Sequence, residues 1–221
     1  ARGGTVIIPS FAVGRAQTLL FHLYRVMSSG QLANVPVFLD SPMAIDASDI
    51  FCRHLEDHKL TDPECRNSCA VAQYVRSMEE SKKLTANPMP KVIISASGMA
   101  TGGRVLHHLK RYAPEAKNTI LFAGFQAAGT RGAAMVAGAE SVKIHGEQIP
   151  IRAEVQNLDM LSAHADADEI LRWLRGFAKP PCTTFVVHGE PSASTTLGKR
   201  LESELGWRCL VPNHGQQVEL A

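Results

Sequence analysis

Short apolar runs alternate with helix-like patterns along the first 125 residues. The runs at residues 5–8, 35–39, 91–95 and 119–123 are short and rich in β-branched side chains, as buried strands are. Apolar residues at helical spacing predict helices over residues 14–29, 41–54, 77–85 and 103–112. Strands separated by helices are typical of an α/β fold with a mainly parallel sheet flanked by helices on both faces.

Cap residues mark where some of these helices begin. Ser41-Pro42 places a cap and then a proline at the first turn, and Ser77 with Glu80 forms a capping box. Asp40 has two interpretations: it faces the carboxyl edge of the sheet, or it caps the following helix, which we favour. The polar stretch 56–70 predicts no definite element.

The pattern changes after residue 138. Alternating runs at 141–145 and 150–155 predict a β-hairpin that turns at Gly146-Glu147. Beyond it we expect helices over 166–177 and 192–205. In the first of these, Ile170, Leu171, Trp173 and Leu174 are expected to face inward. Strands are expected at 183–187, 208–211 and 217–220. We therefore predict two domains, residues 1–160 and 161–221.

The composition is that of an ordinary globular protein. Hydrophobic residues make up 45% and charged residues 20% of the 221 residues, and no apolar run reaches membrane-spanning length, so we expect no membrane partner. The net charge of +2 is too small to argue nucleic-acid binding by itself. Because the chain opens Ala1-Arg2-Gly3-Gly4 and not with Met, we expect it to be part of a longer protein.

The five cysteines do not predict a disulfide framework, because their number is odd and their spacing is scattered. Free thiols in a reducing cytoplasm are the simplest interpretation. Cys65 and Cys69 lie four residues apart and are able to share one side of a helix. The absence of a Cys-x-x-Cys pair argues against a structural zinc of the knuckle type.

Two glycine-rich loops follow predicted strands. Glycines let the backbone approach a ligand, amides at a helix start favour an anion, and an arginine adds a charged donor. Each loop alone is as typical of a plain strand-to-helix connection. At the carboxyl ends of parallel strands, however, the two together favour a phosphate-backbone groove. The candidate substrate-binding residues are Ser10, Arg15, Ser97, Gly98, Gly102, Gly103 and Arg104.

Two histidines stand out from the nine. His164 and His188 each lie at the edge of an apolar stretch, next to small residues and near the carboxylates Asp166 and Glu190. Such imidazoles suit metal ligation or proton transfer. Taken singly, each is more typical of a packing or capping residue; together they favour a functional site. The other histidines are expected at the surface: His22, His54, His58, His107, His108, His145 and His214.

Five strings cover nearly the full chain in order and resemble the β-CASP branch of metallo-β-lactamase-fold nucleases, in particular the prokaryotic relatives of the endonuclease that cleaves messenger-RNA 3′ ends. The strings are Ile8-Pro9-Ser10-Phe11-Ala12-Val13-Gly14-Arg15-Ala16-Gln17, Leu39-Asp40-Ser41-Pro42-Met43-Ala44, Ile94-Ser95-Ala96-Ser97-Gly98-Met99 with Gly102-Gly103-Arg104, Ser162-Ala163-His164-Ala165-Asp166, and Val187-His188-Gly189-Glu190. The resemblance implies that residues 1–160 are most of a β-CASP domain. It implies that residues 161–221 are the C-terminal part of a metallo-β-lactamase αββα fold.

The same resemblance implies roles for the two histidines. His164 corresponds to a histidine near the scissile phosphate that acts as general acid, and His188 to a ligand of one of two zinc ions. Substrate RNA runs between the two domains in this family. The family's first four metal-binding motifs and its motif A carboxylate precede the β-CASP insert and do not occur in this sequence. We therefore expect a zinc-dependent RNA-processing phosphodiesterase in the parent protein, and a fragment that does not fully bind the two zincs and is inactive alone.

Two other functions stay open at this point. A non-catalytic RNA-binding or assembly module fits the basic pI near 8.4 and the missing metal motifs. A small-molecule metallo-hydrolase of the same superfamily is the third alternative. Residues 161–221 are expected to leave strand edges and an apolar face unpaired, which favours association, with a homodimer among the expected partners.

Overall fold

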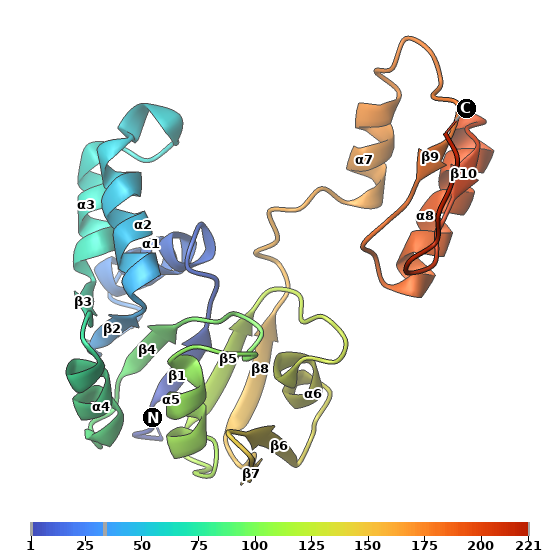
Figure 1. Cartoon of the computed structure of the whole chain (residues 1–221). Helices are drawn as coiled ribbons and strands as arrows, with labels where there is room; N and C mark the ends of the chain where they lie inside the picture. The colour runs from blue at the N-terminus through green and yellow to red at the C-terminus, as the bar shows by residue number, and fades with distance from the viewer. Residues whose placement is uncertain (1, 33–34, 221) are drawn as a thin grey trace. The chain divides into compact units, whose positions relative to one another are not determined.

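The computed structural model describes residues 2–32 and 35–220 and divides the chain into two compact units, Ala1–Ser162 and Ala163–Ala221 (Figure 1). The boundary expected after residue 160 lies two residues before this division. Within the described ranges, no helix is long and apolar enough to cross a membrane.

The first unit is built on a sheet of six strands in the order β3-β2-β4-β1-β5-β8, and every neighbouring pair is parallel. The strands are β1 (Val6–Pro9), β2 (Val37–Asp40), β3 (Ala72–Tyr74), β4 (Val92–Ser95), β5 (Thr119–Ala123) and β8 (Glu154–Leu158). Both Pro9 and Asp40 are in register with Ser95, so β1, β2 and β4 end level with one another. The predicted α/β class with a mainly parallel sheet is confirmed.

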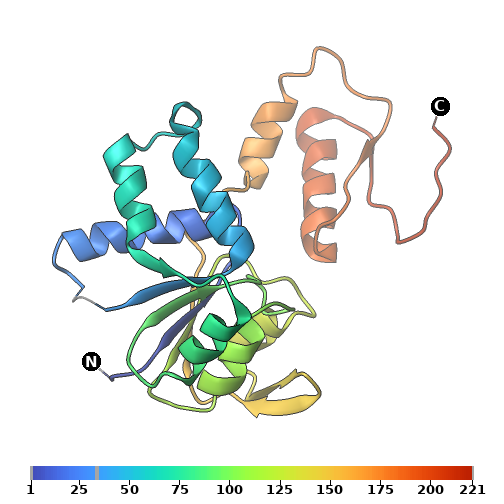
Figure 2. The ribbon, with the colours of Figure 1, turned by 60° about the vertical axis from the view of Figure 1, so that its left-hand side comes forward.

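Helices cover both faces of this sheet, as Figure 2 shows. On one face lie α1 (Arg15–Ser28), α2 (Pro42–Arg53) and α3 (Asp62–Ala70), with a short 3-10 helix at Leu55–Asp57. On the other face lie α4 (Met78–Ala86), α5 (Val105–Tyr112), α6 (Arg131–Val136) and the hairpin of β6 (Ser141–Ile144) and β7 (Glu147–Pro150).

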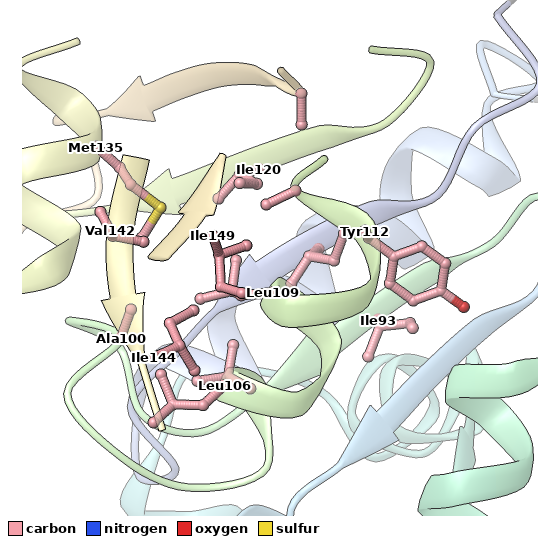
Figure 3. Packing of buried hydrophobic residues seen from close by; sticks show 14 of the residues in the cluster. Ile93, Ala100, Leu106, Leu109, Tyr112, Ile120, Met135, Val142, Ile144 and Ile149 are labelled. Atoms are coloured by element: carbon pink, nitrogen blue, oxygen red, sulfur yellow. The ribbon is translucent and has the colours of Figure 1, made fainter. Parts of the chain in front are cut away.

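Alternate residues of each central strand supply the two cores. Ile7 and Ile93 pack with Leu109 of α5 on one side, and their neighbours Ile8 and Ile94 belong to the core on the other side. Figure 3 shows the first core, where side chains of the hairpin and of α5 meet those of the strands. Burial on both faces explains why these strands read as continuous apolar runs and not as alternating ones.

The prediction for residues 150–155 was wrong. His145 and Gly146 form the hairpin turn with φ of 48° and 86°, and the register Ile144↔Glu147 makes residues 147–150 the second strand. The chain then leaves the hairpin, and residues 154–158 pair with β5 as the parallel edge strand β8. The alternating pattern thus spans parts of two strands that belong to different sheets.

The predicted elements do not include α3, β3, α6 or the short 3-10 helix at Leu55–Asp57. The start of α3 does carry a signal, because Thr61 and Glu64 form a reciprocal capping box with Pro63 in the first turn. Its inner face lacks the large apolar residues that periodicity arguments depend on, since its buried residues are Cys65 and Ser68. The strand β3 has only three residues and α6 only six, which is too short for a periodic pattern.

The second unit contains α7 (Ala167–Leu174), β9 (Thr184–Phe185), α8 (Pro191–Leu205) and β10 (Cys209–Leu210), with β9 and β10 parallel. Its core consists of Leu171, Leu174, Leu201 and Trp207. Two predictions were wrong here. Trp173 is 69% exposed because the buried stripe of α7 runs through Leu171 and Leu174. Residues 217–220 form no strand.

Candidate functional site

The loops after β1 and β4 leave the sheet toward opposite faces. The chain runs from β1 into α1, whose buried residues Leu19 and Leu20 belong to one core, and from β4 into α5, whose Leu109 belongs to the other. Because β1 and β4 are neighbours, their carboxyl ends form the topological switch point of the sheet. In open α/β sheets this is where a ligand-binding crevice forms.

Direct contacts join the loops at this edge. The backbone N–H of Ser10 donates to the carbonyl of Ser95 at 3.0 Å. A Cβ added to Gly98 would lie 2.9 Å from the Phe11 ring and 3.0 Å from its backbone nitrogen, so only glycine fits. The amide Nε2 of Gln126 donates to the carbonyls of Gly98 and Gly124, each at 3.2 Å. The loops after β1, β4 and β5 therefore form one continuous surface.

Arg15 brings a positive charge to this surface. Its Nη1 donates to the carbonyl of Leu161, just beyond β8. Its Nη2 also lies beside Gly124, where an added Cβ would be 3.5 Å away. A guanidinium has five N–H donors, more than one carbonyl accepts. Arg15 is thus held among the loops after β1, β5 and β8 with donor capacity left for an anion.

The Ser97–Gly103 loop holds itself together. The hydroxyl Oγ of Ser97 accepts from the amides of Thr101 at 3.1 Å and Gly102 at 3.2 Å. Gly103 has φ of 76°, and a Cβ there would lie 2.4 Å from the carbonyl oxygen of Ala96. Gly102 faces open space. The loop is therefore preorganised by its own hydrogen bonds.

Two of the predicted substrate-binding residues have their polar groups bonded inside the fold. Arg104 donates through Nη1 to Asp40 Oδ1 at 2.7 Å and through Nη2 to the carbonyl of Arg76 at 2.8 Å. Ser10 is 2% exposed and its hydroxyl donates to the carbonyl of Phe11.

Asp40 is the centre of a buried polar network. It is fully buried, and besides Arg104 it contacts Ser81 Oγ at 2.5 Å and His108 Nε2 at 2.7 Å. Burial by itself would raise the pKa of Asp40, but the hydrogen bonds from His108, Ser81 and Arg104 together hold it below its ordinary value. The carboxylate is therefore charged and compensated inside the protein.

This network corrects two predictions. Asp40 does not cap α2; Ser41 does, through the amide of Ala44. His108 is not a surface residue, because its side chain is fully buried. Its position three residues after Val105 and one before Leu109 places it on the apolar stripe of α5, a signal present in the sequence.

The two singled-out histidines lie on exposed loops of the second unit. His164 precedes α7, and His188 follows β9 with φ of 66°, a backbone conformation uncommon outside glycine. Such outliers concentrate at functional sites. A Cβ on the following Gly189 would lie 2.3 Å from Ser194 Oγ, so the loop packs tightly on α8. Among the described residues, neither histidine belongs to a group of three His, Cys, Asp or Glu donor atoms within 4.8 Å.

Exposed apolar side chains follow four of the parallel strands and were not anticipated as site residues. Phe11 is 50% and Phe125 68% exposed, after β1 and β5. Met43 and Met160, after β2 and β8, are exposed as well. Aromatic rings beside a positive charge are able to stack on bases without selecting a sequence. Phe11 lies within the first of the motif strings, next to the candidate Ser10.

Two family models match the chain and cover parts of this site. The Beta-Casp domain model matches residues 16–135, which include the Ser97–Gly103 loop, Arg104 and all of α1 except its first residue, Arg15. The chain belongs to the β-CASP family of metallo-β-lactamase-fold ribonucleases. A second model, described as a Zn-dependent metallo-hydrolase RNA specificity domain, matches residues 148–212 and covers both His164 and His188.

Several curated proteins are similar to this β-CASP chain. It is 36% identical to Ribonuclease TTHA0252 of Thermus thermophilus over 100% of the chain and 49% of that protein. It is 33% identical to an RNase J-like protein of Methanocaldococcus jannaschii over 96% of the chain and 49% of that protein. Identity to Transcription termination factor FttA of Methanosarcina mazei is 32%, over 92% of the chain and 34% of that protein. The chain thus spans about half or less of the length of these relatives.

Proposed function

We propose that this chain is the β-CASP and C-terminal segment of a zinc-dependent RNA-processing phosphodiesterase, and that it binds single-stranded RNA along the carboxyl edge of its parallel sheet. The observation that carries the proposal is the continuous surface formed by the loops after β1, β4 and β5, with Arg15 held at its side. Supporting it, two relatives carry the names ribonuclease and RNase J-like protein.

The edge has the parts that phosphate-led recognition needs. Arg15 supplies the charge, and Gly102 leaves open space where a strand of RNA can approach the backbone. Gly98 and Gly103 let the loop pack against Phe11 and Ala96, where any side chain would clash. Ser10, Ser97 and Arg104 shape and anchor the loops through internal hydrogen bonds. The rings of Phe11 and Phe125 provide stacking surfaces for bases.

The donors in this chain do not make up a catalytic zinc site by themselves. Catalytic zinc takes about three protein ligands, and no described group of three donor atoms includes His188. In the proposal His188 contributes one ligand, and the other ligands come from a part of the parent protein outside these residues. His164 serves as the proton donor to the leaving oxygen. We accordingly propose that this chain alone does not hydrolyse RNA.

One alternative function has a specific observation in its favour. A non-catalytic RNA-binding or assembly role fits the exposed Phe11, Phe125 and Met160, since such surfaces also serve as protein interfaces, including one in a homodimer. The two functions differ in their response to salt, because counterion release makes phosphate-led binding weaken steeply as salt rises.

Fluorescence anisotropy with a labelled single-stranded oligoribonucleotide tests the proposal. We expect binding at 50 mM salt that weakens by about tenfold or more at 200 mM, because several phosphates are contacted. With zinc added, the oligoribonucleotide should remain intact on a denaturing gel. An affinity that does not change with salt would favour the assembly role, and cleavage by this polypeptide would refute the proposed inactivity.

A further inference from the structure

Three cysteine thiols meet between α2 and α3. Cys52 Sγ lies 2.7 Å from Cys65 Sγ and 3.0 Å from Cys69 Sγ. All three sulfur atoms lie within 4.8 Å of one another. Cys65 is fully buried, and Cys52 and Cys69 are half-buried. We call these three residues the thiol cluster.

The thiol cluster takes the place of an apolar helix interface. The helix α3 packs against α1 and α2, yet its buried residues are Cys65 and Ser68 and no large apolar side chain. The hydroxyl of Ser68 is turned back to the carbonyl of Glu64 at 2.6 Å. Such a face buries little apolar surface, and the hydrophobic contribution to holding α3 in place is correspondingly small.

A hollow at the protein surface opens onto the thiol cluster. Cys52 and Cys69 line it together with Ser48, Asp49, Arg66 and Tyr74. The Tyr74 hydroxyl hydrogen-bonds Cys69, and hydrogen bonds of this kind orient metal ligands. Solvent and a small cation therefore have a route to sulfur atoms that are otherwise covered.

We propose that Cys52, Cys65 and Cys69 bind one zinc-class cation through three thiolates, with the fourth coordination position facing the hollow and filled by water. Each thiol releases its proton to solvent on binding, so three protons leave for one divalent ion taken up. With Zn–S bonds of about 2.3 Å, tetrahedral sulfurs lie roughly 3.8 Å apart. The sulfur atoms need to separate by only about 1 Å, which small side-chain rotations supply.

The thiol cluster lies apart from the proposed RNA-binding edge. Cys52 lies ten residues beyond Pro42, the first residue of α2 at the carboxyl end of β2, which is about 15 Å along the helix. A cation there would tie the end of α2 to α3.

The three thiols lack the lowered pKa of reactive redox cysteines. Burial raises the pKa of Cys69 to about 12, with further contributions from Cys52. Burial also raises the pKa of Cys52 and of Cys65. Reactive redox cysteines have lowered pKa values, because the thiolate is the attacking species.

Zinc and cobalt titrations of the full chain, reduced and stripped of metal with a chelator, test the proposal. We expect one equivalent of zinc at micromolar concentration, a sulfur-to-cobalt charge-transfer band when Co²⁺ replaces zinc, and a rise of about 5 °C in Tm. A colorimetric thiol reagent should leave Cys52 and Cys69 unreacted with zinc bound and react with both after chelation, while Cys182 and Cys209 react in both states and the fully buried Cys65 reacts only on unfolding.

Variants assign the site. Cys69→Ser should lose the bound equivalent, the cobalt band and the thermal shift, while the double variant Cys182→Ser/Cys209→Ser and the variant His188→Ala should keep all three. The thiol-protection measurement needs only the unsubstituted chain and stands even if Cys69→Ser misfolds. The proposal is overturned by zinc binding that survives Cys69→Ser in a folded variant. It is also overturned if no zinc is bound. A protein mass 2 Da lower, which shows a disulfide, overturns it as well if the disulfide forms in the presence of zinc.

Discussion

Arg104 Nη1 donates to Asp40 Oδ1 at 2.7 Å, and the Asp40 side chain is fully buried while that of Arg104 is 15% exposed. The pair joins the end of β2 to the start of α5, across the loop that carries Ser97, Gly98 and Gly103. The sequence predicts Arg104 as a phosphate contact. In the structure its guanidinium is instead positioned to fix the geometry of this loop. The shape of the proposed RNA-binding edge depends on this ion pair.

Removing the arginine should destabilise the first unit. Arg104→Ala leaves a buried carboxylate without its arginine partner, and breaking a buried pair in this way lowers the free energy of unfolding by about 3 kcal/mol. Arg76→Ala is the matched control, because Arg76 forms exposed ion pairs with Asp46 and Asp49. Exposed pairs contribute under about 1 kcal/mol. Urea unfolding of both variants measures the difference, and equal losses would contradict the assignment.

The lowered pKa of Asp40 predicts a pH dependence. A carboxyl group whose pKa is lower in the folded than in the unfolded chain adds stability at pH values above its ordinary 3.8, and this stability is lost as the pH falls through the folded value. Asp40→Asn should therefore be less stable than the unsubstituted chain at pH 7, and the gap should narrow below about pH 4. Denaturant unfolding from pH 7 to pH 3 tests this. Asp57→Asn, at an exposed site, should show no such gap.

The two adjacent glycines of the loop should respond differently to alanine. Gly103→Ala places a Cβ 2.4 Å from the Ala96 carbonyl at φ of 76°, so we expect a loss of about 2 kcal/mol or more in the free energy of unfolding. Gly102→Ala meets open space, and its stability should change by less than about 0.5 kcal/mol. Thermal unfolding compares them, and similar midpoints would show that the loop is not held as described.

Much of the first unit was predictable from sequence because its strands and longer helices are periodic and its helix starts carry caps. Elements without large apolar residues could not be predicted from the sequence pattern. The helix α3 is an example, because its buried residues are Cys65 and Ser68. The sequence pattern also does not predict which residues distant in the sequence come together in space. Nothing in the spacing of Asp40 and Arg104 says that they meet, or that Cys52 joins Cys65 and Cys69.

The proposed phosphate contact and the proposed base-stacking contacts should differ in how RNA affinity depends on salt. Arg15→Ala removes the proposed phosphate contact, so the slope of log affinity against log salt should become shallower by about 0.7. Phe11→Ala and Phe125→Ala remove stacking, which should weaken binding by about 1–3 kcal/mol per base and leave the slope unchanged. Anisotropy titrations at several salt concentrations measure both the affinity and its salt slope. Val136→Ala of α6 is the exposed apolar control. A slope unchanged in Arg15→Ala would exclude it as a phosphate contact.

Hydrogen exchange with and without a bound single-stranded oligoribonucleotide tests the location of the RNA site most directly. We expect slower amide exchange in the loops after β1, β4 and β5, around Phe11, Gly98 and Gly124, and no change in the β6–β7 hairpin. Protection confined to the second unit, or its absence from these three loops while RNA is bound, would contradict the account.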